Sequence, residues 1–318
     1  MAEPISRRTF VQGSIAASTG AALAMSAAGQ AASAEGPAPA APPAPQNALP
    51  KGKIGNLEVS RILLGGNLLT HFTHSRDLQY VYNLAAHYNT EEKIFETMAV
   101  AEANGINTLV IHTAPNVMNF LKKYRNERGG KIQWIICPTA PIEPGLEAYS
   151  KQVQEIVDDG TDAIYLWGVR SDALAGEGKF DLMAQAVELA KAQGVPSGVG
   201  GHKLEVVAAC QQHNVAADFF IKTLHHHNYP SYKLNHDSCW CDQPEEIIEL
   251  MKTIDKPWLA FKVMAAGAIP PQDAFRYAFE SGADFVLSGM FDFEVAEDVR
   301  IAQGILADLP KRTRPWRG

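Results

Sequence analysis

The sequence predicts a (β/α)8 barrel, because strand-like and helix-like segments alternate along most of its 318 residues. Eight short segments are apolar on both faces, as strands of a parallel sheet covered on both sides are. Longer amphipathic segments separate them, and several of these end in Gly or Asn, a common stop signal of helices. Eight such units fit the length of one barrel. An open doubly wound sheet is the alternative, which we disfavour because no Gly-rich dinucleotide motif follows the first strand.

The expected elements follow from this alternation in chain order. The eight strands are expected at residues 61–67, 107–113, 132–139, 162–168, 196–202, 218–226, 258–266 and 284–291. The clearest helix covers residues 90–105, which begin with acidic side chains and end in Gly. Similar helical patterns occupy residues 147–160, 179–194, 203–214, 244–254 and 271–282.

The N-terminal segment predicts an export signal. Arg7 and Arg8 precede an Ala-rich apolar run that ends in A-S-A at residues 32–34, the pattern of a cleavable secretory signal. The paired arginines resemble a twin-arginine signal, which implies the twin-arginine translocation machinery as a partner and a periplasmic or otherwise exported location. We therefore expect a signal peptide at residues 1–34, a Pro/Ala-rich linker at 35–50 and the barrel at 51–318.

Composition and charge exclude several function classes. The formal net charge is −7 and no basic cluster is present, which argues against nucleic acid as a partner. No run after the signal approaches the about 20 apolar residues of a membrane span. Four cysteines are too few for a disulfide scaffold. We expect a small-molecule substrate and a mature chain without a membrane span.

The barrel prediction also locates the functional site. Catalytic groups of such barrels lie at the C-terminal ends of the strands and in the loops that follow. The sixth predicted strand ends in three consecutive histidines, and the long loop after it is rich in aromatic and polar side chains. The candidate substrate-binding residues are Asn67, His112, His225, Tyr229, His236 and Trp240.

Two lysines interrupt apolar strands, Lys222 in the sixth and Lys262 in the seventh. We expect both to face the barrel axis, because an outward ammonium would be buried beneath helices at high cost. Alternation would then turn Phe220 and Leu224 inward together with Lys222. An amine whose pKa is lowered by a cationic neighbour can attack a carbonyl carbon and form an iminium. The pair therefore predicts Schiff-base chemistry.

A family resemblance agrees with this interpretation. The motifs ADFFIKT (217–223), AFKVMAAGAI (260–269) and DAFRYAFESGADFV (273–286) resemble class I aldolases of the deoxyribose-phosphate aldolase type. The resemblance implies that Lys222 forms the Schiff base and that Lys262 lowers its pKa. The family's Ser-rich phosphate loop is replaced here by LSGMFDF, so we expect an unphosphorylated, sugar-like carbonyl compound as substrate.

A second resemblance covers the first half of the barrel. LEVSRILLGGN (57–67), AEANGINTLVIHTAP (101–115) and TDAIYLWGVRSD (161–172) resemble aldo-keto reductases. The catalytic tetrad of that family is missing, so the resemblance implies a related barrel without its hydride transfer. A non-catalytic binding protein on such a barrel is therefore one alternative. At the tetrad positions, His112 stands for the Asp, the Tyr has no counterpart, Pro138 or Thr139 stands for the Lys, and Trp167 or Gly168 stands for the His.

The histidines provide a further alternative. His112, His202 and His226 lie at three predicted strand ends, and neutral imidazoles are good ligands for Zn or Mn. A metal-dependent sugar isomerase, lyase or hydrolase would use them with one open coordination position. The leading prediction remains an aldolase-type lyase or isomerase in which Lys222 is the nucleophile and His226 or His202 transfers protons.

Overall fold

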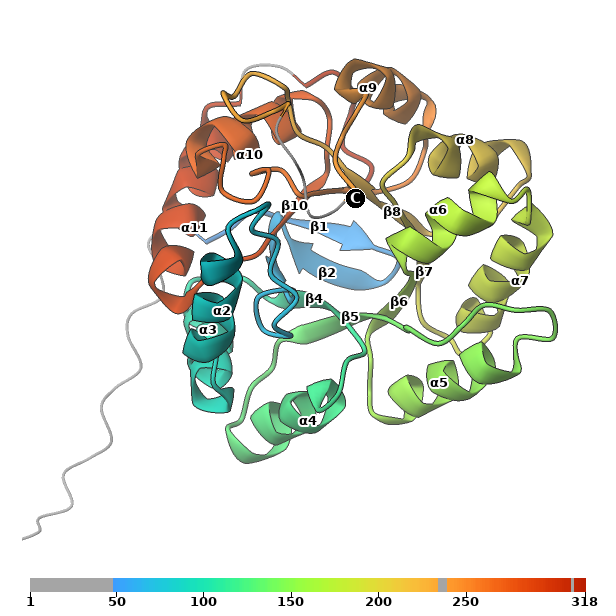
Figure 1. The fold of residues 1–318 in the computed structure, drawn as a ribbon, viewed down its shortest axis with the longest axis horizontal. Coiled ribbons are helices and arrows are strands. Elements are labelled where there is room, and N and C mark those ends of the chain that lie inside the picture. Colours follow the sequence, from blue (N-terminus) through green and yellow to red (C-terminus); the bar gives the residue numbers. More distant parts are fainter. Residues whose placement is uncertain (1–47, 234–238, 310–311) are drawn as a thin grey trace, which may run out of the picture. The chain divides into compact units, whose positions relative to one another are not determined.

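The computed structural model describes residues 48–233, 239–309 and 312–318, and it contains a closed barrel of eight parallel strands (Figure 1). The strands follow one another around the barrel in chain order, with β10 pairing β3 to close it. This confirms the predicted (β/α)8 barrel. The barrel strands are β3 (Ile62–Gly65), β4 (Thr108–His112), β5 (Gln133–Cys137), β6 (Ala163–Leu166), β7 (Ser197–Gly201), β8 (Phe219–Thr223), β9 (Trp258–Phe261) and β10 (Phe285–Ser288).

Helices surround the strands as an outer ring (Figure 1). Most follow the expected scheme of one helix after each strand, and the unexpected ones include a short helix that begins directly after β6. The helices are α2 (Gln79–Tyr88), α3 (Glu91–Ala103), α4 (Val117–Glu127), α5 (Glu147–Asp158), α6 (Gly168–Gly176), α7 (Phe180–Lys191), α8 (Leu204–Gln212), α9 (Pro244–Thr253), α10 (Pro271–Glu280) and α11 (Asp292–Ala307).

An antiparallel hairpin closes the N-terminal end of the barrel. It consists of β1 (Lys51–Ile54) and β2 (Leu57–Ser60) and crosses the barrel end in Figure 1. Ile54 and Val59 are fully buried against the side chains inside the barrel. Because one end is closed by apolar side chains, only the C-terminal end can serve as an open mouth.

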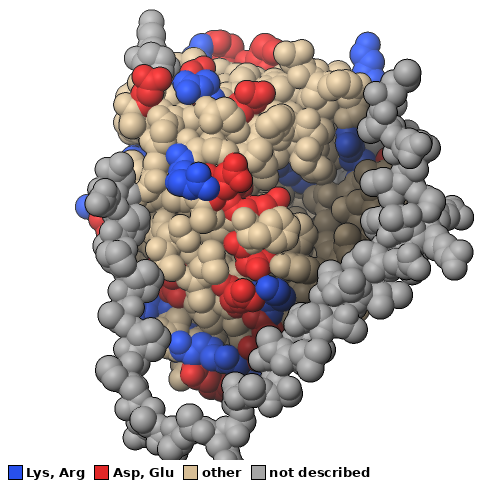
Figure 2. All heavy atoms as spheres, turned by 90° about the vertical axis from the view of Figure 1, so that its left-hand side faces the viewer, with Lys and Arg blue, Asp and Glu red and all other residues tan. Residues whose placement is uncertain are grey.

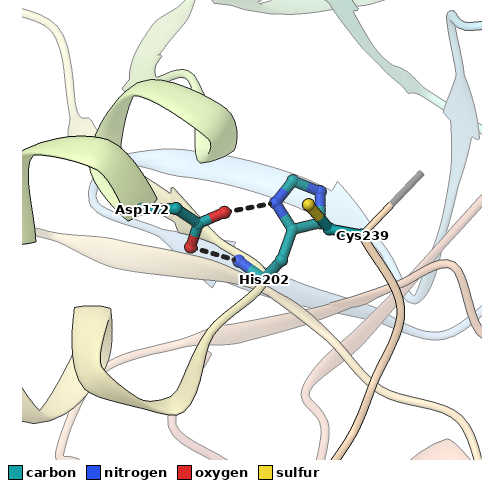
Figure 3. Close-up of side chains that lie close together, drawn as sticks. All are labelled: Asp172, His202 and Cys239. Atoms are coloured by element: carbon teal, nitrogen blue, oxygen red, sulfur yellow. Dashed lines mark hydrogen bonds and ion pairs between the residues drawn. The ribbon is translucent and has the colours of Figure 1, made fainter. Parts of the chain in front are cut away.

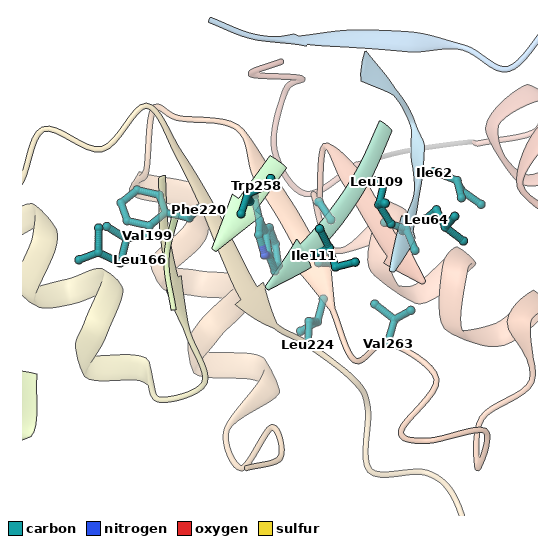
Figure 4. Close-up of a cluster of buried hydrophobic side chains, with 14 of the residues drawn as sticks. Ile62, Leu64, Leu109, Ile111, Leu166, Val199, Phe220, Leu224, Trp258 and Val263 are labelled. Carbon is teal, nitrogen blue, oxygen red and sulfur yellow. The ribbon is translucent and has the colours of Figure 1, made fainter. Parts of the chain in front are cut away.

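Two separate clusters of apolar side chains define which way each strand residue points. The inner cluster takes one or two residues from most barrel strands and none from the helices, for example Leu63, Ile135 and Phe219. The outer cluster joins the opposite faces of the same strands, such as Phe220 and Trp258, to the helices (Figure 4). Assignment of a strand residue to one cluster therefore fixes the direction of its neighbours by alternation.

The strand bounds differ from the prediction where it matters for the site. The strand expected at 218–226 ends at Thr223, and the strand expected at 258–266 ends at Phe261. After Phe261 the backbone turns sharply, with positive φ at Lys262 (59°), Ala265 (47°) and Ala266 (55°). Left-handed conformations of non-Gly residues cost energy and cluster at functional sites. The two strands that carry or precede the lysines thus end earlier than their apolar patterns predict, at Thr223 and at Phe261.

The predicted signal (1–34) and most of the predicted linker (35–50) lie outside the described residues. The last linker residues already belong to the fold, because Leu49 is 3% exposed and the Pro50 carbonyl accepts a hydrogen bond from the Arg61 backbone N–H at 2.9 Å. Within the described part of the chain, no helix is long and apolar enough to cross a membrane.

Acidic and basic side chains are interspersed on the face formed by α2, α3 and α11 (Figure 2). Lys93, for example, pairs with Glu96 at 2.7 Å and with Asp292 at 3.0 Å.

Candidate functional site

A hydrogen-bonded carboxylate and imidazole lie at the mouth of the barrel (Figure 3). His202 directly follows β7, and Asp172 lies in α6, the helix that starts right after β6. Asp172 Oδ2 is 2.7 Å from His202 Nδ1, and Oδ1 accepts the backbone N–H of His202 at 2.9 Å and of Lys203 at 3.0 Å. Both side chains are buried, with 6% and 8% of Asp172 and His202 exposed. These three bonds fix the position and the ring orientation of His202.

Burial and neighbouring charges set the protonation of this pair. Burial would raise the pKa of Asp172, but the hydrogen bonds from His202 and Lys203 outweigh it and hold that pKa below its ordinary value. Burial lowers the pKa of His202, and the ammonium groups of Lys262 and Lys222 lower it further, against the opposing effect of Asp172. Near neutral pH the pair is therefore a carboxylate and a neutral imidazole. With Nδ1 donating to Asp172, Nε2 is left as a proton acceptor.

Aromatic side chains line the mouth beside this pair. Tyr165 and Phe261 belong to the inner face of the barrel but keep part of their surface exposed. The ring of Phe261 lies 6.0 Å from that of His202. His112 stacks on Trp167, with ring centroids 6.3 Å apart and planes 5° apart. Flat aromatic surfaces next to a buried imidazole suit the apolar faces of a small ring or chain compound.

Lys222 does not face the barrel axis, and the prediction that it does is wrong. Phe220 and Leu224 pack in the outer cluster with the helices, and alternation places Lys222 on the same face. Its side chain is 1% exposed, and Nζ donates to the His202 carbonyl oxygen at 2.6 Å. Burial lowers the pKa of Lys222 to about 8, against opposing charges that include Asp172. The outward ammonium is tolerated because a backbone carbonyl and nearby acidic groups compensate part of its desolvation.

Lys262 lies at the mouth rather than inside the barrel. It follows the last residue of β9, and its Nζ donates to the Cys239 carbonyl oxygen at 2.8 Å. The same ammonium lies 5.5 Å from the centre of the Phe261 ring. Lys262 therefore supplies a partly exposed positive charge close to His202, whereas Lys222 supplies a buried one behind it.

The three consecutive histidines have different surroundings. His225 is fully buried, and its Nε2 accepts the backbone N–H of Cys241 at 3.0 Å. His227 Nε2 lies 2.6 Å from the carbonyl oxygen of Cys241, so it donates there. His226 points toward α10, where its ring meets that of Tyr277 at 5.2 Å. Two of the three histidines therefore hold a loop, and the third lies away from His202.

The other predicted substrate-binding residues have structural contacts. The Asn67 carbonyl oxygen accepts the backbone N–H of Phe72 at 2.8 Å, which orders the loop after β3. Tyr229 and Trp240 are 8% and 6% exposed and pack around His225, with ring centroids 5.9 Å and 5.4 Å away. His236 lies outside the described residues.

Of the three metal ligands predicted from sequence, His202 is the one that belongs to a group of possible ligands in the structure. Within the described residues, the group whose ligand atoms all lie within 4.8 Å of one another is Asp172, His202 and Cys239. His112 and His226 are not part of it, because one is stacked on Trp167 and the other lies against α10. Sequence reasoning missed both Asp172 and Cys239. A polar residue one turn into the helix that follows a strand end was the signal available for Asp172.

Comparison with known proteins supports the fold alone. No protein-family model and no curated protein matches this chain. Solved structures with the same barrel include one described as a putative aldo-keto reductase, from Pseudomonas aeruginosa, which is 17% identical in sequence and has a TM-score of 0.54. The match covers 80% of this chain and 95% of that chain. An aldo-keto reductase from Bacillus halodurans in its holo form has 14% identity, coverage of 85% and 100%, and a TM-score of 0.55. A truncated 3-deoxy-D-arabino-heptulosonate 7-phosphate synthase from Thermotoga maritima has 10% identity, coverage of 83% and 95%, and a TM-score of 0.52. At 10–17% identity these likenesses show the barrel fold and nothing about the chemistry of this chain.

Proposed function

We propose that this protein is an exported lyase or isomerase that acts on a small, sugar-like carbonyl compound by proton transfer at His202. The observation that carries the proposal is the 2.7 Å hydrogen bond between Asp172 and His202 at the open end of the barrel. Catalytic groups of (β/α)8 enzymes lie at this end. A carboxylate that orients an imidazole in this way is the arrangement of a general acid–base catalyst.

The proposed chemistry follows from the protonation of the pair. Neutral His202 takes a proton from the carbon next to the substrate carbonyl, and Asp172 stabilises the imidazolium that forms. The ammonium of Lys262 is partly exposed and close enough to lower the pKa of His202, and it would stabilise the enediolate oxygen. Return of the proton to the neighbouring carbon gives isomerisation, and its delivery to a leaving group gives elimination.

The proposed substrate carries no phosphate. Barrels that bind phosphate commonly do so with the loops after the last two strands and a nearby helix N-terminus. Here α11 follows β10 and begins with Asp292, which is paired with Lys93 at 3.0 Å and accepts the Tyr88 hydroxyl at 2.7 Å. A carboxylate at this position repels an anion. The aromatic side chains of the mouth favour an uncharged sugar-like compound.

Schiff-base chemistry at Lys222 is the second candidate. Burial lowers its pKa to about 8, so that roughly a tenth of the amine is neutral near pH 7. Against it, Nζ faces the His202 carbonyl and the side chain is 1% exposed. Borohydride reduction in the presence of keto-sugars should trap an adduct on Lys222 if the amine reaches the substrate. Failure to trap with any sugar that is turned over would eliminate this candidate.

A bound metal is the third candidate, since Asp172, His202 and Cys239 bring a carboxylate, an imidazole and a thiol within 4.8 Å of one another. The carboxylate oxygens already accept three N–H groups, which a metal would have to displace in part. Elemental analysis of protein purified without chelators or a His tag tests this. About one metal per chain, lost in the Asp172→Ala variant, would replace acid–base chemistry by metal-assisted chemistry.

Solvent-deuterium exchange tests the leading proposal without knowledge of the product. A panel of aldoses and ketoses is incubated with the protein in D2O, and loss of the proton next to the carbonyl is followed by NMR. We expect exchange with a subset of the sugars, and a fall of on the order of 100-fold or more in the His202→Asn variant. His213→Asn is the matched control, because His213 stacks on Phe180 at 4.0 Å and has no part in the mouth. Sugars that bind without exchange would instead favour a non-catalytic binding protein.

Export rests on the sequence of the first 34 residues. Replacement of both Arg7 and Arg8 by Lys should retain the full-length precursor in the cytoplasmic fraction if the twin-arginine machinery carries the protein. Unchanged secretion would assign the signal to a different route.

A further inference from the structure

Cys239 is the one exposed cysteine of the chain, since Cys137, Cys210 and Cys241 are buried. Its sulfur lies within 4.8 Å of a ring nitrogen of His202 and of a carboxylate oxygen of Asp172 (Figure 3). A thiol close to an imidazole that a carboxylate orients can be activated as a nucleophile when the sulfur and the ring nitrogen approach to hydrogen-bonding distance.

The backbone around this thiol is held from several sides. The Cys239 carbonyl oxygen accepts a hydrogen bond from Lys262 Nζ at 2.8 Å. Two residues later, the N–H of Cys241 donates to His225 and its carbonyl oxygen accepts from His227, at 3.0 Å and 2.6 Å. Such support from buried or backbone partners is what a side chain needs to be presented in one geometry.

The tautomers of the two supporting histidines follow from these bonds. His225 Nε2 accepts a hydrogen bond from the backbone N–H of Cys241, so the ring proton is on Nδ1, which lies 3.2 Å from the His226 carbonyl oxygen. His227 donates from Nε2 to Cys241. Both rings are bound to the backbone of Cys241, so they position the loop that carries Cys239.

We propose that Cys239 is a nucleophile that adds reversibly to the aldehyde carbon of the substrate. The substrate class, a sugar-like carbonyl compound, would then be restricted to aldehydes that resemble aldoses. This rests on the function proposed above. The S–H proton moves to His202 Nε2, and a sulfur electron pair forms the S–C bond. The electron pair of the C=O bond becomes an alkoxide, which takes the proton back from His202. The product is a thiohemiacetal, with no leaving group and no oxidant.

The arrangement fits this role better than a metal site, because Asp172 already uses both oxygens to hold His202 and its backbone. Among the three side chains of this cluster, His202 Nε2 and the Cys239 thiol are then the groups that remain to react with a substrate. The ammonium of Lys262, which is bound to the Cys239 carbonyl oxygen at 2.8 Å, would stabilise the alkoxide that forms. One imidazole would thus serve the thiol during capture of the aldehyde and, after the thiohemiacetal has reverted to the free aldehyde, the carbon acid of the proposed reaction, because only the carbonyl form acidifies the neighbouring C–H.

Alkylation by iodoacetamide tests the thiol independently of any turnover. The reagent should modify Cys239 alone in the native protein, and the Cys239→Ser variant should remain unmodified. We expect the rate near pH 7 to fall on the order of tenfold or more in His202→Asn, and to fall in Asp172→Asn as well. Equal rates in the original protein and in His202→Asn would overturn the proposal. So would a thiol that reacts only after treatment with a chelator, because it would then be a metal ligand.

Protection by an aldehyde tests the adduct itself. Glyceraldehyde should slow the alkylation of Cys239 in the original protein, whereas dihydroxyacetone, its ketone isomer, should not. Protection by neither compound, or equally by both, would refute aldehyde capture. Deuterium exchange that persists in Cys239→Ser would keep acid–base chemistry at His202 and remove the thiol from the mechanism, so the two proposals fail separately.

Discussion

Replacement of Lys222 by Met should change how stability depends on pH. In the folded protein burial lowers the pKa of Lys222 from 10.5 to about 8. Below pH 8 the amine is charged in the folded and the unfolded protein, so the full cost of burying the charge is present. Between about pH 8 and 10.5 the unfolded chain binds more protons than the folded one, so stability rises with pH. The Met variant lacks this titration.

The size of the effect follows from the shift. About 1.4 kcal/mol per pKa unit gives a difference on the order of 3 kcal/mol between the two ends of this range. The side chain is 1% exposed, so solvent screening reduces this figure little. The loss of the hydrogen bond to the His202 carbonyl acts at every pH and cancels when the two ends are compared.

Urea unfolding of both proteins near pH 7 and near pH 10.5 measures the quantity directly. The free energy of unfolding of the original protein minus that of Lys222→Met should rise with pH. Lys151→Met serves as control for the lost charge, because the Lys151 side chain is 80% exposed on α5. A difference that stays flat or falls with pH would mean that the amine is not buried as a charged group.

Three further perturbations test other parts of the structure. Asp298 in α11 is 4% exposed, and burial raises its pKa from 3.8 to about 7, so the folded protein keeps a proton that the unfolded chain has lost and its stability falls as pH rises from about 4 to 7. In urea unfolding near pH 8, Asp298→Asn should therefore be more stable than the original protein by on the order of 4 kcal/mol. An equal difference between the two proteins at pH 4 and at pH 8 would contradict this. Asp284 is fully buried between Arg314 at 2.9 Å and Arg312 at 3.5 Å. Asp284→Asn should leave the buried guanidinium groups without a negative partner and cost about 3 kcal/mol of stability in thermal unfolding. A loss below about 1 kcal/mol would show that backbone carbonyls alone compensate the two guanidinium charges. A methyl group at Gly168 would lie 3.0 Å from His202 Cε1. Gly168→Ala should therefore displace the imidazole ring and lower the rate of deuterium exchange on the order of tenfold, with little change in melting temperature. An unchanged rate would remove His202 from the reaction.

The fold could be predicted from sequence because its signals are local. Alternation of apolar strands with amphipathic helices depends on residues close together in the chain. The hairpin of residues 51–60 was not predicted, since two strands of four residues each carry too little periodicity. The location of the site at the C-terminal mouth followed from the fold class alone.

The direction of Lys222 could not be predicted in the same way. Alternation gives the spacing of residues that share a face, but not which face is inside. Phe219, Phe220 and Ile221 are all apolar, so β8 has no polar face to mark the outside. The energetic argument against an outward ammonium left out the carbonyl of His202, which belongs to the neighbouring strand end and comes close only after β7 and β8 pair. A contact of this kind has no signature in the sequence of either strand.

The histidine run shows why residue type alone misleads about roles. Three imidazoles at a strand end predict ligands or catalysts, because each is chemically able to be one. In the structure, the backbone of Cys241 satisfies His225 and His227, and the catalytic candidate is His202, from a different strand. What distinguishes His202 is its partner Asp172, 30 residues earlier in the chain. An imidazole acquires a catalytic role when a carboxylate fixes one nitrogen and leaves the other open, and that condition is met only by chain segments that the barrel brings together.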